Sequence, residues 1–224
     1  AVGHVERFYR PDALVISGAG NVDHREFVDL GASSFGGLEG SRPPRVPIEA
    51  EAQLDIRLID KTTEQVHFCL GTGGFAQDRK EKYALATIDS VLGGGMSSRL
   101  FQEIRENRGL AYAIGSYSAS YEEAGMFAVY GGTSIQNIKC VLELTQLECD
   151  NIRKNSVTDT ELARAKNQIR GALVLGQESM SNRMSRLAKS EMYFGRIIRL
   201  DEIITAITEV TKDDVAHVAS QLFE

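Results

Sequence analysis

Two patterns of hydrophobic residues divide the chain into strands and helices. Short apolar runs, several of which end at glycine, predict strands over residues 13–17, 66–70, 112–121 and 126–133. Elsewhere apolar residues recur every three or four positions, which is typical of amphipathic helices. These repeats predict helices over residues 78–92, 138–152, 158–173, 180–188 and 211–222.

Three helices are expected to begin at a capping box, in which a small polar residue is followed three positions later by an acid. The pairs are Asp23 and Glu26, Thr158 and Glu161, and Thr211 and Asp214. The first of them predicts a further helix directly after the strand at 13–17.

The last two predicted strands are joined by a short polar turn, Glu122-Glu123-Ala124-Gly125, so they should form an antiparallel hairpin. The roughly ninety residues that follow are mostly helical, and strands do not alternate with helices as they do around a parallel sheet. We expect an α+β fold with an antiparallel β-sheet of four or five strands and helices packed mainly on one face.

Composition excludes several classes of function. A formal net charge of -6 argues against a general nucleic-acid-binding protein, which normally carries a basic excess. The apolar runs are too short to span a membrane. Cys69, Cys140 and Cys149 have no CxxC spacing, so we expect reduced thiols and a reducing compartment.

Two glycine-rich motifs resemble nucleotide-binding loops but lack their decisive residues. Gly18-x-Gly20 follows a predicted strand, yet Asp23 stands where a third glycine is needed, and an acid there would repel a pyrophosphate. The triplet Gly93-Gly94-Gly95 is not followed by the lysine of a P-loop. Neither motif predicts a nucleotide site.

Residues 93–132 carry the candidate chemistry, as a glycine-rich loop, a short helix, a tight turn and the hairpin. Arg105 closes the helix and Tyr112 opens the first strand, so both side chains can point into one cleft. Their donors would there stabilise a carbonyl oxygen that gains negative charge. Spacing alone favours the simpler interpretation, a solvated arginine and a half-buried strand tyrosine.

This stretch closely resembles the second half of the pitrilysin/insulinase-type zinc metallopeptidases, the family that includes the mitochondrial processing peptidase. Residues 8–12 and 18–24 resemble family segments as well. The resemblance implies that Arg105 and Tyr112 are catalytic and reach the active site from the half that faces the zinc. It also implies a substrate-binding glycine loop, with the candidate residues Gly93, Gly94, Gly95, Ser97 and Arg99.

The zinc motif of that family is missing. The family binds zinc through His-x-x-Glu-His on a helix and a later Glu, whereas His4, His24, His67 and His217 are too far apart in sequence to build it. We expect no metal ligand in this chain. Zinc would be held by an absent half of the protein or by a partner subunit.

The ends of the chain echo each other, because Val2-Gly3-His4-Val5 and Val215-Ala216-His217-Val218 both approach a phenylalanine. In the family, each half of a subunit repeats one α/β unit. By that resemblance, residues 1–40 are the tail of a mostly absent zinc-binding domain and residues 41–52 are a proline-rich linker. Residues 53–224 are then a second α+β domain that lacks its last strand, and the chain is an interior fragment.

The resemblance implies the non-zinc half of a zinc metalloendopeptidase that cleaves unfolded peptides as a dimer with a facing subunit. The chain alone would be inactive. A bacterial cytoplasmic protein is the first expectation for its location, and the mitochondrial matrix is the alternative. Two other functions stay open: a non-catalytic family member, such as the processing peptidase's glycine-loop subunit or a respiratory-complex core protein, and a plain interaction domain.

Overall fold

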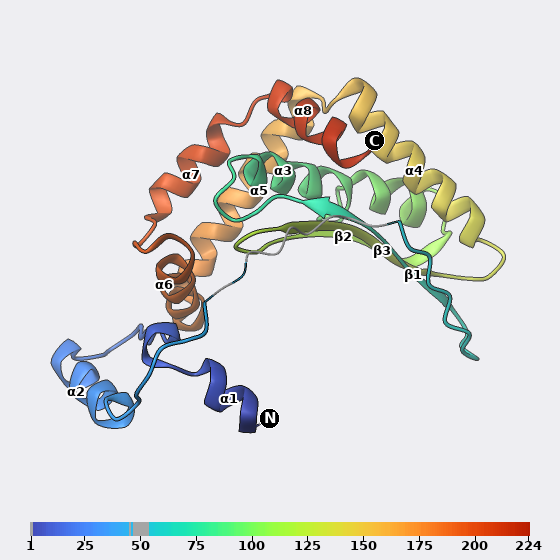
Figure 1. Ribbon diagram of the computed structural model, residues 1–224. Helices are drawn as coiled ribbons and strands as arrows, with labels where there is room; N and C mark the ends of the chain where they lie inside the picture. The colour runs from blue at the N-terminus through green and yellow to red at the C-terminus, as the bar shows by residue number, and fades with distance from the viewer. Residues whose placement is uncertain (1, 45, 47–53) are drawn as a thin grey trace. The chain divides into compact units, whose positions relative to one another are not determined.

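The structure is a computed structural model that describes residues 2–44, 46 and 54–224 (Figure 1). These residues form two compact units. The larger unit comprises residues 54–171 and Asp201–Glu224, and the smaller comprises the described residues up to 46 together with Ala172–Leu200. Most of the predicted linker, residues 41–52, lies outside the described residues.

The larger unit is built on an antiparallel sheet of β1 (Val66–Gly74), β2 (Ala111–Ser120) and β3 (Gly125–Thr133), in the order β1-β3-β2. β3 lies in the centre and pairs Val129 with Leu70 of β1 and with Ser116 of β2. The predicted hairpin is thus confirmed. The sheet has three strands in the described residues, so the expectation of four or five was wrong.

Residues 13–17 account for one of the strands that were expected and not found. They belong to the smaller unit, where a 3-10 turn, η1 (Pro11–Ala13), is followed by backbone that pairs with no strand among the described residues. The hydroxyl of Ser17 donates instead to the carbonyl oxygen of Met184, at 3.0 Å. An apolar run therefore indicated extended backbone here but not a sheet partner.

β1 continues beyond its predicted end at residue 70, through the glycine-rich residues to Gly74. The glycines do not stop the strand because β3 approaches them closely. A Cβ atom on Gly74 would lie 2.8 Å from the backbone nitrogen of Met126, closer than real Cβ atoms come. Glycine at this position thus permits the pairing.

Helices α3 (Glu81–Leu92), α4 (Ile138–Asn155) and α8 (Lys212–Leu222) cover one face of the sheet (Figure 1). The core lies between them and the sheet. Its buried side chains include Leu85, Ile88 and Leu92 of α3, Val141 and Ile152 of α4, Val215 and Val218 of α8, and Phe127 and Val129 of β3. The opposite face of the sheet carries no helix from the described part of this unit.

Helix α5 (Asp159–Leu175) and helix α8 begin at capping boxes, as predicted. The Thr158 hydroxyl accepts from the amide of Glu161 while the Glu161 carboxylate accepts from the amide of Thr158. Thr211 and Asp214 repeat this arrangement. Helix α7 (Leu200–Glu209) lies between these two helices in the chain.

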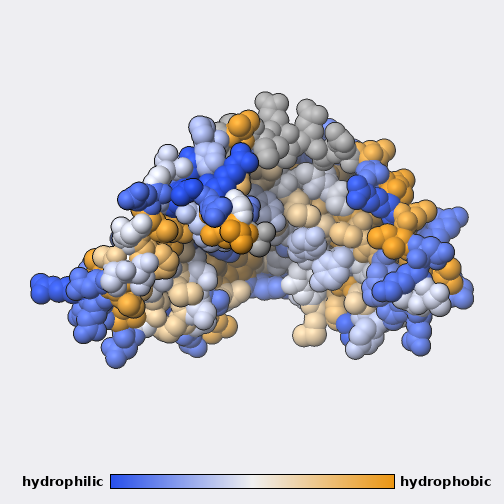
Figure 2. Space-filling view, turned by 60° about the horizontal axis from the view of Figure 1, so that its bottom comes forward, coloured by the Kyte–Doolittle hydropathy of each residue, from blue (hydrophilic) through white to orange (hydrophobic). Residues whose placement is uncertain are grey.

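The smaller unit has little core. Its elements are α1 (Val2–Phe8), η1, α2 (His24–Phe35), η3 (Gly176–Glu178) and α6 (Met180–Phe194). Asp23 caps α2 as predicted, by accepting from the amides of Arg25 and Glu26. No residue of α1 or α2 is buried, so apolar side chains such as Val2 and Leu30 lie at the surface. Figure 2 shows hydrophobic residues interspersed with hydrophilic ones on one face of the molecule.

Candidate active site

Residues 93–110, here named the connecting segment, join the end of α3 to the start of β2. The segment contains a π-helical turn, η2 (Phe101–Glu106), in which the amide of Asn107 donates to the carbonyl oxygen of Gln102 at 2.8 Å. The short helix expected before the hairpin is therefore wider than an α-helix. Turns of this kind often occur at functional sites.

The structure brings Arg105 and Tyr112 together. The guanidinium carbon of Arg105 lies 5.1 Å from the centre of the Tyr112 ring and 4.7 Å from the centre of the Phe101 ring. Both distances fall within the range of a cation–π interaction. The Arg105 Nε lies 3.8 Å from a carboxylate oxygen of Glu106, and Tyr112 is 76% exposed. A cation and a phenol thus meet at the surface, held by two aromatic contacts.

Phe101 was missed by sequence reasoning. It precedes Arg105 by four positions, a spacing at which side chains on a helical turn are neighbours. That spacing was a usable signal, because an aromatic ring one turn before an arginine can carry its guanidinium. Phe101 therefore belongs to the candidate site as the second ring of the stack.

A β-bulge presents Tyr112. Ala111 pairs with Thr133 and Ala113 pairs with Gly132, so Tyr112 is an extra residue between two consecutive ladder positions. Ala111 is buried, whereas Tyr112 and Ala113 are both exposed, which a regular strand does not allow for neighbouring residues. Bulges commonly redirect a side chain next to an active site.

The glycine triplet packs closely and does not act as an open loop. A Cβ atom on Gly93 would lie 2.3 Å from the backbone nitrogen of Ser116, and one on Gly94 would lie 2.8 Å from Cα of Ser90. The Gln168 side chain of α5 donates to the Gly94 carbonyl oxygen at 3.1 Å. Gly93 thus lets the end of α3 approach β2, a close backbone contact that only glycine allows.

Asp89 of α3 forms hydrogen bonds to the start of the connecting segment and to β2. Sequence reasoning missed this residue as well. Its carboxylate accepts from the Ser116 hydroxyl at 2.5 Å and from the Ser118 hydroxyl at 3.5 Å, while its carbonyl oxygen accepts from the amides of Gly93 and Gly94. Burial raises the pKa of the Asp89 carboxyl, and the serine hydrogen bonds oppose part of that rise. Asp89 thereby ties α3, the glycine triplet and β2 together.

Arg99 is bound within the fold. Its guanidinium donates to both carboxylate oxygens of Glu161, at 2.7 and 2.9 Å, and lies 3.7 Å from Glu148. Its side chain is only 18% exposed. Burial would raise the pKa of Glu161, but hydrogen bonds from Arg99 and from Thr158 outweigh burial and lower it to about 2. Ser97, in contrast, is exposed.

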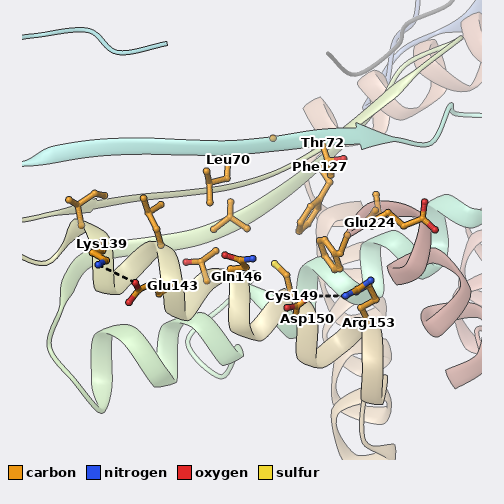
Figure 3. A pocket seen from close by; sticks show the side chains of 17 residues that line it. Leu70, Thr72, Phe127, Lys139, Glu143, Gln146, Cys149, Asp150, Arg153 and Glu224 are labelled. Carbon is orange, nitrogen blue, oxygen red and sulfur yellow. Dashed lines mark hydrogen bonds and ion pairs between the residues drawn. The ribbon is translucent and has the colours of Figure 1, made fainter. Parts of the chain in front are cut away.

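A separate apolar groove of about 810 Å³ lies between the edge strand β1 and helix α4 (Figure 3). Leu70 and Thr72 face Gln146 and Cys149 across it, and Glu224 lies at one end. The lining includes no residue of the connecting segment and neither member of the Arg105–Tyr112 pair. Burial raises the pKa of the Cys149 thiol to about 12, so this sulfur stays protonated and unreactive.

The residues present do not fit a zinc site. Zinc requires three or four converging His, Cys, Asp or Glu ligands. In the part of the chain that the structure describes, no three such side chains gather in a way that could hold a metal ion. His67 lies on β1 and His217 on α8, while His4 and His24 belong to the smaller unit. Among the helices described, none has the length and apolar character needed to cross a bilayer.

Comparison with known proteins identifies the family. The family model described as the peptidase M16 inactive domain matches residues 3–169. The chain belongs to the peptidase M16 family. This confirms the resemblance to zinc metallopeptidases that residues 93–132 indicated, and the M16 model covers most of the described larger unit.

Relatives of this M16 chain are named zinc proteases. An uncharacterized zinc protease of Streptomyces coelicolor is 38% identical over 229 residues, which cover 96% of this chain and 50% of that protein. An uncharacterized zinc protease of Bacillus subtilis is 37% identical over 220 residues, which cover 98% of this chain and 54% of that protein. The M16 chain thus spans about half the length of these relatives.

A solved structure shares the fold of this M16 chain. The crystal structure of a peptidase M16 inactive domain from Pseudomonas fluorescens matches with a TM-score of 0.81 at 23% identity, over 92% of this chain and 49% of that one. The likeness confirms the α+β class with an antiparallel sheet and helices around it.

Proposed function

We propose that this M16 domain is the non-zinc half of a zinc metalloendopeptidase that cleaves unfolded peptides. Within it, Arg105 and Tyr112 hold the reacting or a neighbouring carbonyl group of the peptide. The observation that carries the proposal is the contact between the Arg105 guanidinium and the Tyr112 ring, 5.1 Å apart, in an exposed position. The zinc protease names of the relatives support it.

The arrangement suits a carbonyl oxygen that gains negative charge. The rings of Phe101 and Tyr112 contact the guanidinium through its carbon, and its N–H donors lie in the guanidinium plane. The bulge holds the phenol beside those donors. Donors that are already in place when charge develops are the most effective way to stabilise an oxyanion.

The substrate-binding residues expected from the sequence divide into two groups under this proposal. Gly93, Gly94, Gly95 and Arg99 shape the connecting segment, because the glycines pack against β2 and α3 or receive Gln168, and Arg99 is paired with Glu161. Ser97 is exposed and keeps its proposed role in contacting the peptide.

Under this proposal, zinc is bound outside this chain. Because the described residues do not fit zinc, the metal and the base that activates water would come from the other half of the protein or from a facing subunit. The chain's own residues bind the peptide, orient its carbonyl group and donate hydrogen bonds to its oxygen. A dimer, or a two-half protein that closes over the peptide, follows from this division of roles.

Substitution of Tyr112 by Phe in the complete protein tests the function. Phenylalanine keeps the ring on the guanidinium and removes only the phenol donor, so kcat should fall by roughly 10- to 1,000-fold while the melting temperature and zinc content stay unchanged. The measurement is hydrolysis of a fluorogenic peptide with metal analysis in parallel. A variant that retains the kcat/KM of the unmodified protein would instead support the non-catalytic scaffold function.

A further inference from the structure

The face of the sheet opposite the helices carries no charged side chain. Its residues alternate along the strands, from His67 to Gly73 in β1, from Met126 to Gly132 in β3 and from Ala113 to Ala119 in β2. None of them is Asp, Glu, Lys or Arg. An exposed sheet face in a protein of this charge normally bears such residues, and a surface without them is typical of an interaction site.

Two tyrosines dominate this face. The rings of Tyr117 and Tyr130 lie 6.0 Å apart at an interplanar angle of 53°, and the two residues are 39% and 45% exposed. Ala128 is opposite Tyr117 on the same face and is fully buried, which indicates that the rings cover it. The two rings thus project from a sheet face whose neighbouring residues are mostly glycine and alanine.

Tyr130 links this face to the candidate active site. A Cβ atom on Gly115 would lie 3.0 Å from the Tyr130 hydroxyl oxygen and 3.3 Å from the carbonyl oxygen of Gly93. The Tyr130 phenol and the Gly93 carbonyl group therefore both lie next to Gly115. At the start of the strand, Ala113 begins the face directly after Tyr112. The uncharged face and the Arg105–Tyr112 pair are thus continuous.

We propose that Tyr117 and Tyr130 form a subsite that binds an apolar side chain of the extended peptide substrate. The proposal rests on the peptidase function above. From Tyr112 to Tyr117 the strand advances by roughly 15 Å, so the bound side chain lies about four or five residues from the carbonyl group held by Arg105. An uncharged face cannot form ion pairs with an acidic or basic segment, whereas tyrosine, glycine and alanine provide contact area for apolar side chains.

The test uses the complete protein and two tyrosine variants. Tyr117→Ser removes a ring from the subsite. Tyr121→Ser removes an exposed ring that lies beyond the end of β2 and outside the face, and it serves as the matched control. Fluorogenic peptides that differ only in carrying Phe or Asp at successive positions report kcat/KM. Binding of a labelled Phe peptide is measured by fluorescence polarisation with a chelator present, so that it does not depend on cleavage.

The unmodified protein should prefer Phe over Asp at one position by on the order of tenfold or more in kcat/KM. Tyr117→Ser should reduce this preference to within about threefold and weaken peptide binding on the order of tenfold. Tyr121→Ser should leave the preference and the peptide affinity unchanged. Cleavage with a preference that Tyr117→Ser leaves intact would overturn the subsite and leave the peptidase function standing.

Peptide binding that Tyr117→Ser weakens, in a protein that cleaves no peptide, would support the subsite and overturn the proposed function. A Tyr117→Ser variant that changes only the assembly mass or the melting temperature would overturn the subsite. Such a result would show that the face packs against another part of the protein or a second copy. Failure of the unmodified protein to bind the Phe peptide would overturn it as well.

Discussion

Arg105 and Arg108 are three residues apart, yet their guanidinium groups have different surroundings. Arg105 lies between the rings of Phe101 and Tyr112. Arg108 donates to Glu103, at 2.5 and 2.9 Å, in a pair whose side chains are 49% and 32% exposed. Exposed ion pairs of this kind contribute little to stability. The two arginines therefore provide a candidate functional position and its control close together in the chain.

Arg105→Lys should lower kcat/KM of the complete protein by about tenfold or more, although the charge is kept. A guanidinium is planar, stacks on rings and offers several donors, whereas an ammonium is a compact point charge. Arg108→Lys should stay within about threefold of the unmodified protein. Steady-state hydrolysis of one peptide by all three proteins provides the comparison, and equal losses in both variants would show that Arg105 has no special role.

Glu161→Gln should change how stability depends on pH. The unfolded chain takes up a proton on Glu161 near its ordinary pKa of 4.5, but in the folded protein the pKa is about 2. Glu161 therefore makes its full contribution to the free energy of unfolding of the unmodified protein above about pH 5. This contribution should be lost as the pH falls from about 5 to 2. The variant cannot take up this proton. The difference in free energy of unfolding between the variant and the unmodified protein should therefore shrink as the pH falls from about 5 to 2.

Urea unfolding at a series of pH values measures this effect. Glu143→Gln is the control, because Glu143 is 64% exposed and lies 3.8 Å from Lys139 on the surface of α4. Its unfolding free energy should follow that of the unmodified protein at every pH. A Glu161→Gln deficit of constant size between pH 5 and 2 would contradict the protonation argument.

Sequence reasoning at this scale placed Arg105 and Tyr112 together but missed the residues that support them. Arg105 and Tyr112 were identified from their places at the ends of adjoining elements, and the structure brings them into contact. Arg99 was grouped with them because it lies beside the glycine triplet. Its partner Glu161 is 62 residues away in sequence, and a single sequence does not show which carboxylates a fold brings to an arginine.

Among the secondary-structure elements, β2 and the segment before it depart from regular geometry in two places. The π-helical turn places Phe101 against Arg105, and the bulge exposes Tyr112 next to Ala113. Each feature adds a residue to the regular helical turn or strand, and the alternation of apolar residues does not reveal this addition. The pattern therefore predicted which elements exist here, while the departures that present the side chains came only from the structure.

Gly93→Ala should destabilise the protein, by about 2 kcal/mol or more in the free energy of unfolding. Its new Cβ atom would lie 2.3 Å from the backbone nitrogen of Ser116, and neither backbone can yield without moving α3 or β2. Gly171→Ala in α5 is the matched control. No atom lies within 4 Å of its new Cβ, so alanine should raise helix stability by up to about 1 kcal/mol.

Urea unfolding of both glycine variants measures the difference. A Gly93→Ala protein as stable as the unmodified one would show that the connecting segment moves away from β2 at little cost. The glycine triplet would then be a flexible loop.

At the scale of the whole molecule, the described residues bring Arg105 and Tyr112 together but provide no metal ligands that converge. Stable binding of zinc needs at least three converging side chains, and the described residues provide no such group. The predicted boundaries at residues 40 and 52 stay predictions. The grouping of Ala172–Leu200 with the N-terminal residues could not be inferred from the order of elements along the chain, because contact between distant segments leaves no local pattern.

The isolated chain should retain no stoichiometric zinc after dialysis and should not hydrolyse peptides. Elemental analysis and a fluorogenic peptide assay measure the two properties, with the complete protein as the reference. One tightly held zinc per chain, accompanied by peptidase activity, would contradict the division of roles proposed here.

The ion pair between Arg99 and Glu161 also sets an order of events during synthesis. At about 5–20 residues per second, the 62 residues that separate the two side chains take a ribosome roughly 3 to 12 seconds to translate. Until Glu161 has been synthesised, the connecting segment lacks this ion pair. The connecting segment therefore gains this ion pair only after β2, β3 and α4, which lie between Arg99 and Glu161 in the chain, have been synthesised.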